Sequence, residues 1–98
     1  MANWYTEEVK TLFEAILTLQ SMEECRSFFE DVCTVKELRE ISQRLQVAQM
    51  LREGTSYAVI NAKTGVSTAT ISRVGRCLEY GPGGYELVLT RLSKGEEP

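Results

Sequence analysis

Apolar residues recur every third or fourth position along almost the whole chain, which is the spacing of one face of an α-helix. Val9, Leu12 and Ile16 follow this spacing near the N-terminus. Val88 and Leu92 follow it near the C-terminus. No segment alternates apolar and polar residues in a sustained way, as a half-buried strand does. The sequence therefore predicts an all-α protein with six helices.

Polar and glycine residues mark where these helices begin and end. Thr6 precedes the first apolar stripe and is suited to accept a hydrogen bond from a free N–H group of the helix. Ser21 and Thr34 each stand three residues before a glutamate, which is the capping-box spacing. Gly54 and Gly65 stand where two further helices are expected to end.

The length of 98 residues predicts a single domain over residues 1–98. Within it we assign dimerisation helices to 1–55, a helix-turn-helix to 56–80, a C-terminal dimerisation helix to 81–93 and a polar tail to 94–98. A chain this short has little interior for several apolar stripes. A homodimer would bury them, and two-fold dimers are the commonest oligomers.

Histidine is absent, which excludes Ser–His and Cys–His nucleophile pairs and imidazole metal ligands. The cysteines are Cys25, Cys33 and Cys77, with no C-x-x-C pair among them. An odd number of cysteines without an export signal predicts reduced thiols, buried as small apolar residues. The carboxylates are scattered and form no recognisable catalytic set. We therefore expect no enzyme activity, no metal and no cofactor.

The sequence contains no run of 18 apolar residues, and its start, MANWYTEEVK, lacks the basic and apolar stretches of a secretory signal. A cytoplasmic protein without a membrane partner is expected.

The formal net charge of −3, taken alone, would disfavour nucleic acid, but the charge is unevenly distributed. Residues 1–33 carry two basic and seven acidic residues, whereas residues 34–80 carry seven basic and four acidic ones. This asymmetry indicates a polyanion partner for the middle of the chain.

The segment YAVINAKTGVSTATISRVG has the layout of a helix-turn-helix, with a short helix, a turn containing Gly65 and a second helix over 67–80. Asn61 is the one irregularity, because such motifs usually have a small residue near this position. The apolar residues expected to be buried between the two helices are Ile60, Val66, Ile71 and Val74.

The outward face of the second helix carries short hydroxyl side chains and arginines, and no carboxylate before Glu79. In such motifs the N-terminal residues of this helix enter the major groove of DNA, and Ala69 could contact a thymine methyl group. Double-stranded DNA is therefore the predicted partner. The predicted DNA-binding residues are Ser67, Thr68, Ala69, Thr70, Ser72, Arg73 and Arg76.

The segments TVKELREISQRLQVAQML and TGVSTATISRVGRCLEYGP resemble the Trp-repressor superfamily, and most closely its YerC/YecD-type helix-turn-helix branch. The resemblance covers residues 34–92 by sequence and the first two helices by layout. It implies a six-helix Trp-repressor-like fold in an intertwined homodimer. It also implies a transcriptional repressor whose paired recognition helices bind two half-sites of an operator.

The resemblance further implies an effector pocket at Thr34, Arg44, Arg73, Val74 and Cys77. In the Trp repressor, tryptophan is held there by a threonine, two arginines, a glycine and a serine, so Val74 and Cys77 depart from the family pattern. Valine adds a branched side chain where the family needs space, and a thiol is a weaker hydrogen-bond partner than a hydroxyl. We expect tryptophan not to bind, while another small-molecule effector stays open. Helix capping explains Thr34 without a ligand, an ion pair explains Arg44, and a phosphate contact explains Arg73.

One alternative from another class of protein fits the same sequence. A helical protein-interaction module without DNA binding could use the apolar stripes and the acidic N-terminal region to bind a protein. Recovery of DNA duplexes by the protein separates the two hypotheses.

Overall fold

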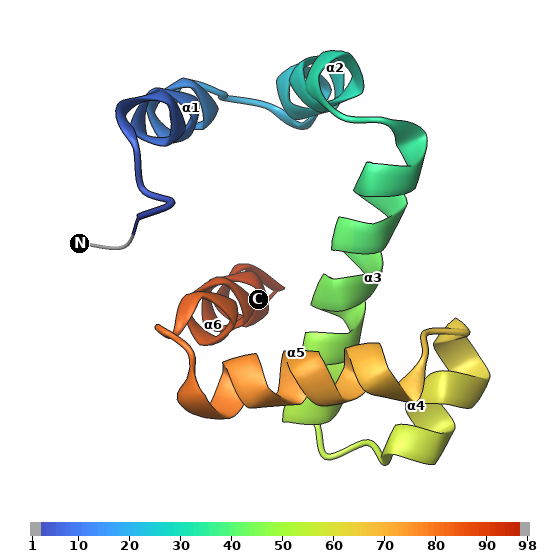
Figure 1. Cartoon of the computed structure of the whole chain (residues 1–98). Coiled ribbons are helices and arrows are strands. Elements are labelled where there is room, and N and C mark those ends of the chain that lie inside the picture. The colour runs from blue at the N-terminus through green and yellow to red at the C-terminus, as the bar shows by residue number, and fades with distance from the viewer. Residues whose placement is uncertain (1–2, 97–98) are drawn as a thin grey trace. The chain divides into compact units, whose positions relative to one another are not determined.

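The structure is a computed structural model that describes residues 3–96, and within this range it contains six helices and no strand (Figure 1). This confirms the all-α prediction. None of the described helices is long and apolar enough to cross a membrane. The helices are α1 (Glu7–Ile16), α2 (Met22–Val32), α3 (Val35–Arg52), α4 (Tyr57–Thr64), α5 (Thr68–Tyr80) and α6 (Gly84–Glu96).

The predicted N-caps are formed. The Thr6 hydroxyl accepts a hydrogen bond from the N–H of Val9, and the Ser21 hydroxyl accepts one from the N–H of Glu24. At the start of α3 the capping box is reciprocal. The Glu37 N–H donates to Thr34 Oγ1 over 3.1 Å, and the Thr34 N–H donates to the Glu37 carboxylate over 2.8 Å. These bonds satisfy backbone donors that have no partner inside a helix, so they fix where each helix begins.

The chain divides into two compact units, one up to Leu38 and one from Arg39. In the first unit, α1 and α2 bury no residue. Leu17 and Met22 are 83% and 85% exposed, respectively. The apolar side chains predicted for this part of the chain therefore lie on helices, but the first unit does not bury them.

The second unit contains the hydrophobic core. Helices α3, α4, α5 and α6 all contribute to it, and α5 packs against both α4 and α6 (Figure 1). The four apolar residues predicted for the helix-turn-helix are all buried, as expected. Val47 of α3 is fully buried. The buried core residues in the described part of the chain are Val47, Ala48, Ile60, Val66, Ile71, Val74 and Leu89.

Two glycines end helices as predicted. Gly54 and Gly65 have φ values of +86° and +74°, in the left-handed region that glycine enters without a steric penalty. After Gly54, the N–H of Thr55 donates to the carbonyl of Met50, which closes the end of α3. Helix α6 runs to Glu96, so it continues past residue 93, where the C-terminal helix was expected to end.

Candidate nucleic-acid interface

Helices α4 and α5 pack against each other around Ile60, Ile71 and Val74, which have exposed fractions of 0%, 0% and 1%. Side chains this deeply buried hold one helix firmly against the other, because any relative movement would open space in a close-packed interior. The two helices that the sequence predicts as a helix-turn-helix are therefore packed closely together in the second unit.

The turn between the two helices is closed by side chains as well as by backbone. The N–H of Gly65 donates to the carbonyl of Asn61 over 2.9 Å, and the Asn61 side-chain amide donates to the carbonyl of Val66 over 2.8 Å. The Thr64 hydroxyl donates to the carbonyl of Ile60 and accepts from the N–H of Val66. Asn61, the irregular residue of the motif, thus has a specific place in the turn.

Ser67 begins the second helix of the motif. Its hydroxyl oxygen accepts a hydrogen bond from the N–H of Thr70 over 3.2 Å, and its hydroxyl group lies 3.1 Å from Thr70 Oγ1. The first turn of α5 contains no acidic residue. The positive end of the helix dipole is therefore not neutralised by a carboxylate from its own helix.

The predicted DNA-binding residues lie on the outward side of this helix with one exception. Ser67, Thr68, Ala69, Ser72, Arg73 and Arg76 are exposed. Thr70 is half-buried and lines a recess with Glu40, Gln43, Arg44 and Val66. The structure therefore presents hydroxyl and guanidinium groups on one face of α5 and apolar groups on the opposite face.

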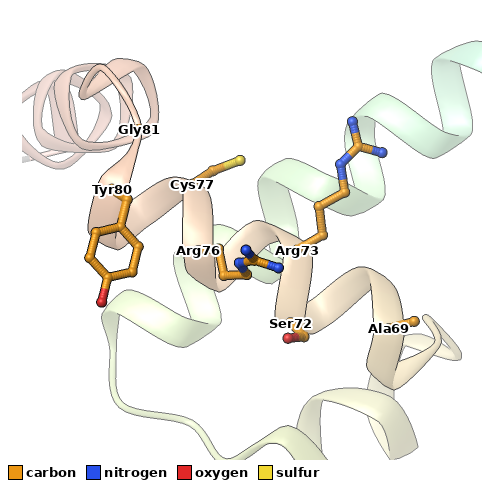
Figure 2. A pocket seen from close by; sticks show the side chains of 7 residues that line it. All are labelled: Ala69, Ser72, Arg73, Arg76, Cys77, Tyr80 and Gly81. Carbon is orange, nitrogen blue, oxygen red and sulfur yellow. The ribbon is translucent and has the colours of Figure 1, made fainter.

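A shallow groove of about 410 Å³ follows this face (Figure 2). Arg73 and Arg76 project from it, and neither has an ion pair or hydrogen bond in the part of the chain that the structure describes. No carboxylate lines the groove, so its charge is positive. Its lining residues are Ala69, Ser72, Arg73, Arg76, Cys77, Tyr80 and Gly81.

Tyr80 lies outside the surface predicted from the sequence. Its side chain is 79% exposed, and it lies one helical turn beyond Arg76. The spacing of 72, 76 and 80 along one helical face was visible in the sequence and could have identified it.

The burial predicted for the cysteines is wrong for Cys77, which is exposed on α5, while Cys25 and Cys33 are half-buried. Ile71 and Val74 occupy the inward face of α5, and position 77 lies outside it. All three thiols are free.

The four residues of the implied effector pocket that belong to the second unit lie in different places. Arg44 and Cys77 line an apolar cavity of about 510 Å³ between α3, the end of α5 and α6. Arg73 and Cys77 line the outward groove, and Val74 is buried in the core. Thr34 belongs to the first unit, where it caps α3. The remaining residues around the Arg44 cavity are Ile41, Leu45, Pro82, Gly84, Tyr85 and Val88.

Among the residues that the structure describes, two carboxyl groups have clearly shifted pKa values, and both lie at helix starts. A hydrogen bond from the Thr34 N–H lowers the pKa of Glu37, and a hydrogen bond from the Thr6 hydroxyl lowers the pKa of Glu8. Helix capping accounts for both shifts. Among the side chains that the structure describes, no group of three or more Cys, Asp and Glu residues is arranged to hold a metal ion.

The chain matches the family model described as Trp repressor protein over residues 7–93. It is 52% identical over 90 residues to the uncharacterized protein YerC of Bacillus subtilis (strain 168), covering 92% of this chain and 86% of that protein. The crystal structure of a TrpR-like protein from Eubacterium eligens ATCC 27750 superposes with a TM-score of 0.87. It is 54% identical and covers 91% of this chain and 92% of that one. A solved structure from Staphylococcus aureus also gives a TM-score of 0.87 at 49% identity, covering 92% of this chain and 90% of that one.

Proposed function

The chain belongs to the Trp repressor family, and on this premise we propose that it is a cytoplasmic, sequence-specific DNA-binding regulator that binds an operator and represses transcription. The observation that carries the proposal is the outward face of α5, where Arg73 and Arg76 are exposed and unpaired among the described residues. Free guanidinium groups suit the phosphates of DNA, because they lose no existing ion pair on binding.

The start of α5 is the part that would enter the major groove, with Ser67, Thr68, Ala69 and Thr70 nearest the base edges. Hydroxyl groups there can donate to or accept from bases, and the methyl group of Ala69 suits a thymine methyl. Arg73 and Arg76 lie one and two turns further along, where phosphate contacts set the register of the helix on the duplex.

The proposal is tested by selecting duplexes from a random pool and then measuring affinity by fluorescence anisotropy at several salt concentrations. Arg73→Ala and Arg76→Ala should each weaken binding to all duplexes and reduce the salt slope by about one unit. Arg91→Ala, which removes an exposed arginine from α6, is the matched control. If the unmodified protein enriched no duplex, the helical protein-interaction module would be the better account.

We propose that the functional form is a homodimer. Helices α1 and α2 bury no residue, and the exposed side chains of the first unit include the large apolar groups of Leu17 and Met22. Isolated helices of 10 and 11 residues are marginally stable in water, so their stability must come from packing that a second copy would supply. Sedimentation of an 11.1 kDa species at micromolar concentration would overturn this part of the proposal.

Tryptophan is not part of the proposed mechanism. Val74 is buried in the core, and Cys77 offers a weak thiol in place of a hydroxyl. Calorimetry with L-tryptophan should therefore give no micromolar binding. Binding at that level would show that α5 moves enough to open space beside Val74, and a different effector in the Arg44 cavity would leave this expectation intact.

A further inference from the structure

We infer that Tyr80 and Arg76 together bind a backbone phosphate of DNA at the C-terminal end of α5, an inference that rests on the proposed function. The predicted contact surface ended at Arg76. The groove along α5 continues past it to Tyr80 and Gly81, so the contact with the duplex extends about one helical turn further.

The two side chains are available for a ligand. Tyr80 is 79% exposed, and in the described chain its hydroxyl has no hydrogen-bond partner. Arg76 is exposed and unpaired within the same range. The two residues are four positions apart in one helix, which places them on neighbouring turns of the same face. Both side chains line the groove, and Figure 2 shows Arg76 in front of α5 and Tyr80 at the C-terminal end of this helix.

The length of α5 favours a phosphate over a base as the ligand. Tyr80 lies 12 residues after Thr68, which corresponds to about 18 Å along the helix axis. The major groove is only about 8.5 Å deep. If the start of α5 faces the base edges, its last turn lies near the rim of the groove, where the phosphates are.

The chemistry of the pair fits the same ligand. The guanidinium of Arg76 supplies charge and several donors, and the Tyr80 phenol supplies one neutral donor. Both groups lie in a groove without a carboxylate, so no anion of the lining set repels the phosphate. A guanidinium and a neutral donor leave different signatures in a salt titration, because only the charged group displaces a counterion.

The test uses the full chain and a duplex selected with the unmodified protein. Tyr80→Phe removes only the hydroxyl and should weaken binding about threefold to thirtyfold, while leaving the salt slope unchanged. Arg76→Ala should weaken binding and reduce the slope by about one unit. When Tyr80→Phe is combined with Arg76→Ala, it should lower the DNA affinity less than it does alone, because both groups bind one phosphate. Tyr5→Phe, which removes a hydroxyl from the first unit, is the matched control and should bind as the unmodified protein does.

Three results would overturn the inference. The first is binding by Tyr80→Phe within twofold of the unmodified protein. The second is a double variant in which Tyr80→Phe lowers the DNA affinity as much as it does in the unmodified protein. This result would mean that the two groups bind different ligands. The third is a Tyr80→Ala variant whose sedimentation changes, which would assign the side chain to contact with a second copy. If the unmodified protein bound no duplex at all, the proposed function would fail, and this inference would fail with it.

Discussion

The side-chain amide of Asn61 donates a 2.8 Å hydrogen bond to the backbone carbonyl of Val66, across the turn that joins α4 to α5. The carbonyl of Asn61 accepts from the N–H of Gly65 in the same turn. One residue therefore closes the turn from both its backbone and its side chain. Helix α5 begins directly after this turn, so its start is fixed by a hydrogen bond as well as by the core.

Replacement of Asn61 by aspartate should destabilise the turn. The variant has nearly the same shape but places a carboxylate, which cannot donate, against the Val66 carbonyl. We expect the free energy of unfolding to fall by about 1–2 kcal/mol in urea titrations. Asn3→Asp adds the same charge at an exposed position of the first unit and is the control. Equal stability of the two variants would show that the hydrogen bond contributes nothing.

A second prediction concerns the close contact between α4 and α5 at Gly75. A β-carbon at this position would lie 2.9 Å from the Tyr57 hydroxyl and 3.7 Å from Leu51 Cδ1. Alanine in a helix interior is favoured over glycine by about 1 kcal/mol, but this gain is opposed by the clash with the hydroxyl. Tyr57→Phe removes that oxygen. We expect Gly75→Ala to be stabilising by about 0.5–1 kcal/mol when it is combined with Tyr57→Phe, and by less in the unmodified protein.

A thermodynamic cycle of the two single variants and the double variant measures this coupling directly. If the two substitutions change the free energy of unfolding additively within about 0.3 kcal/mol, the Tyr57 side chain moves away from the new methyl group at no cost. The cycle also reports on the contact that holds the first helix of the motif against the second, because Tyr57 belongs to α4 and Gly75 to α5.

The positions of the helices could be predicted from the sequence because helix limits depend on local chemistry. Thr6, Ser67 and Gly65 act through hydrogen bonds or backbone angles within a few residues of themselves. Burial in α3 was harder to predict, since apolar residues occur on more than one of its faces. Ile41 of this helix is 49% exposed, whereas Val47 is fully buried.

The same distinction applies to the candidate site. The outward face of α5 follows from helical spacing, so most of its residues were identified in advance. The role of Asn61 depends on where the chain goes after the turn, and the apolar cavity beside Arg44 depends on how α6 packs. Neither arrangement has a signature at a fixed spacing along the chain.

A third prediction concerns the link between α3 and α6. Arg52 Nη2 lies 3.0 Å from Glu86 Oε1 and donates a 2.9 Å hydrogen bond to Thr90 Oγ1. The two charged side chains are 33% and 59% exposed, so solvent weakens their attraction. Glu86→Gln should therefore lower the free energy of unfolding by at most about 1 kcal/mol, part of it from the helix dipole of α6.

Salt distinguishes this ion pair from an uncharged contact. The difference in unfolding free energy between Glu86→Gln and the unmodified protein should shrink when urea titrations are repeated in about 1 M salt. Exposed charges are then screened within about 3 Å. Glu79→Gln removes an exposed glutamate of α5 that has no ion pair in the described chain, and it serves as the control. A deficit that is the same in low and high salt would assign the effect to packing or to the hydrogen bond with Thr90.

The last prediction concerns acid. The hydrogen bond from the Thr34 N–H lowers the pKa of Glu37 below its ordinary value of 4.5. A carboxyl group with a depressed pKa in the folded state stabilises that state above its unfolded pKa, and the contribution is lost as the pH falls through the folded value. Glutamine keeps an acceptor for the Thr34 N–H but does not titrate. Glu37→Gln should therefore be less stable than the unmodified protein at pH 7, and the difference should disappear as the pH falls below 4.5.

Unfolding followed by circular dichroism at pH 7, 5, 4 and 3 measures this difference. Thr34→Ala removes the other half of the capping box and should cost about 1 kcal/mol at pH 7. Thr34→Ser keeps the hydroxyl and both hydrogen bonds, so it is the matched control and should follow the unmodified protein at every pH. If the difference between Glu37→Gln and the unmodified protein stayed constant from pH 7 to pH 3, ionised Glu37 would not stabilise the start of α3.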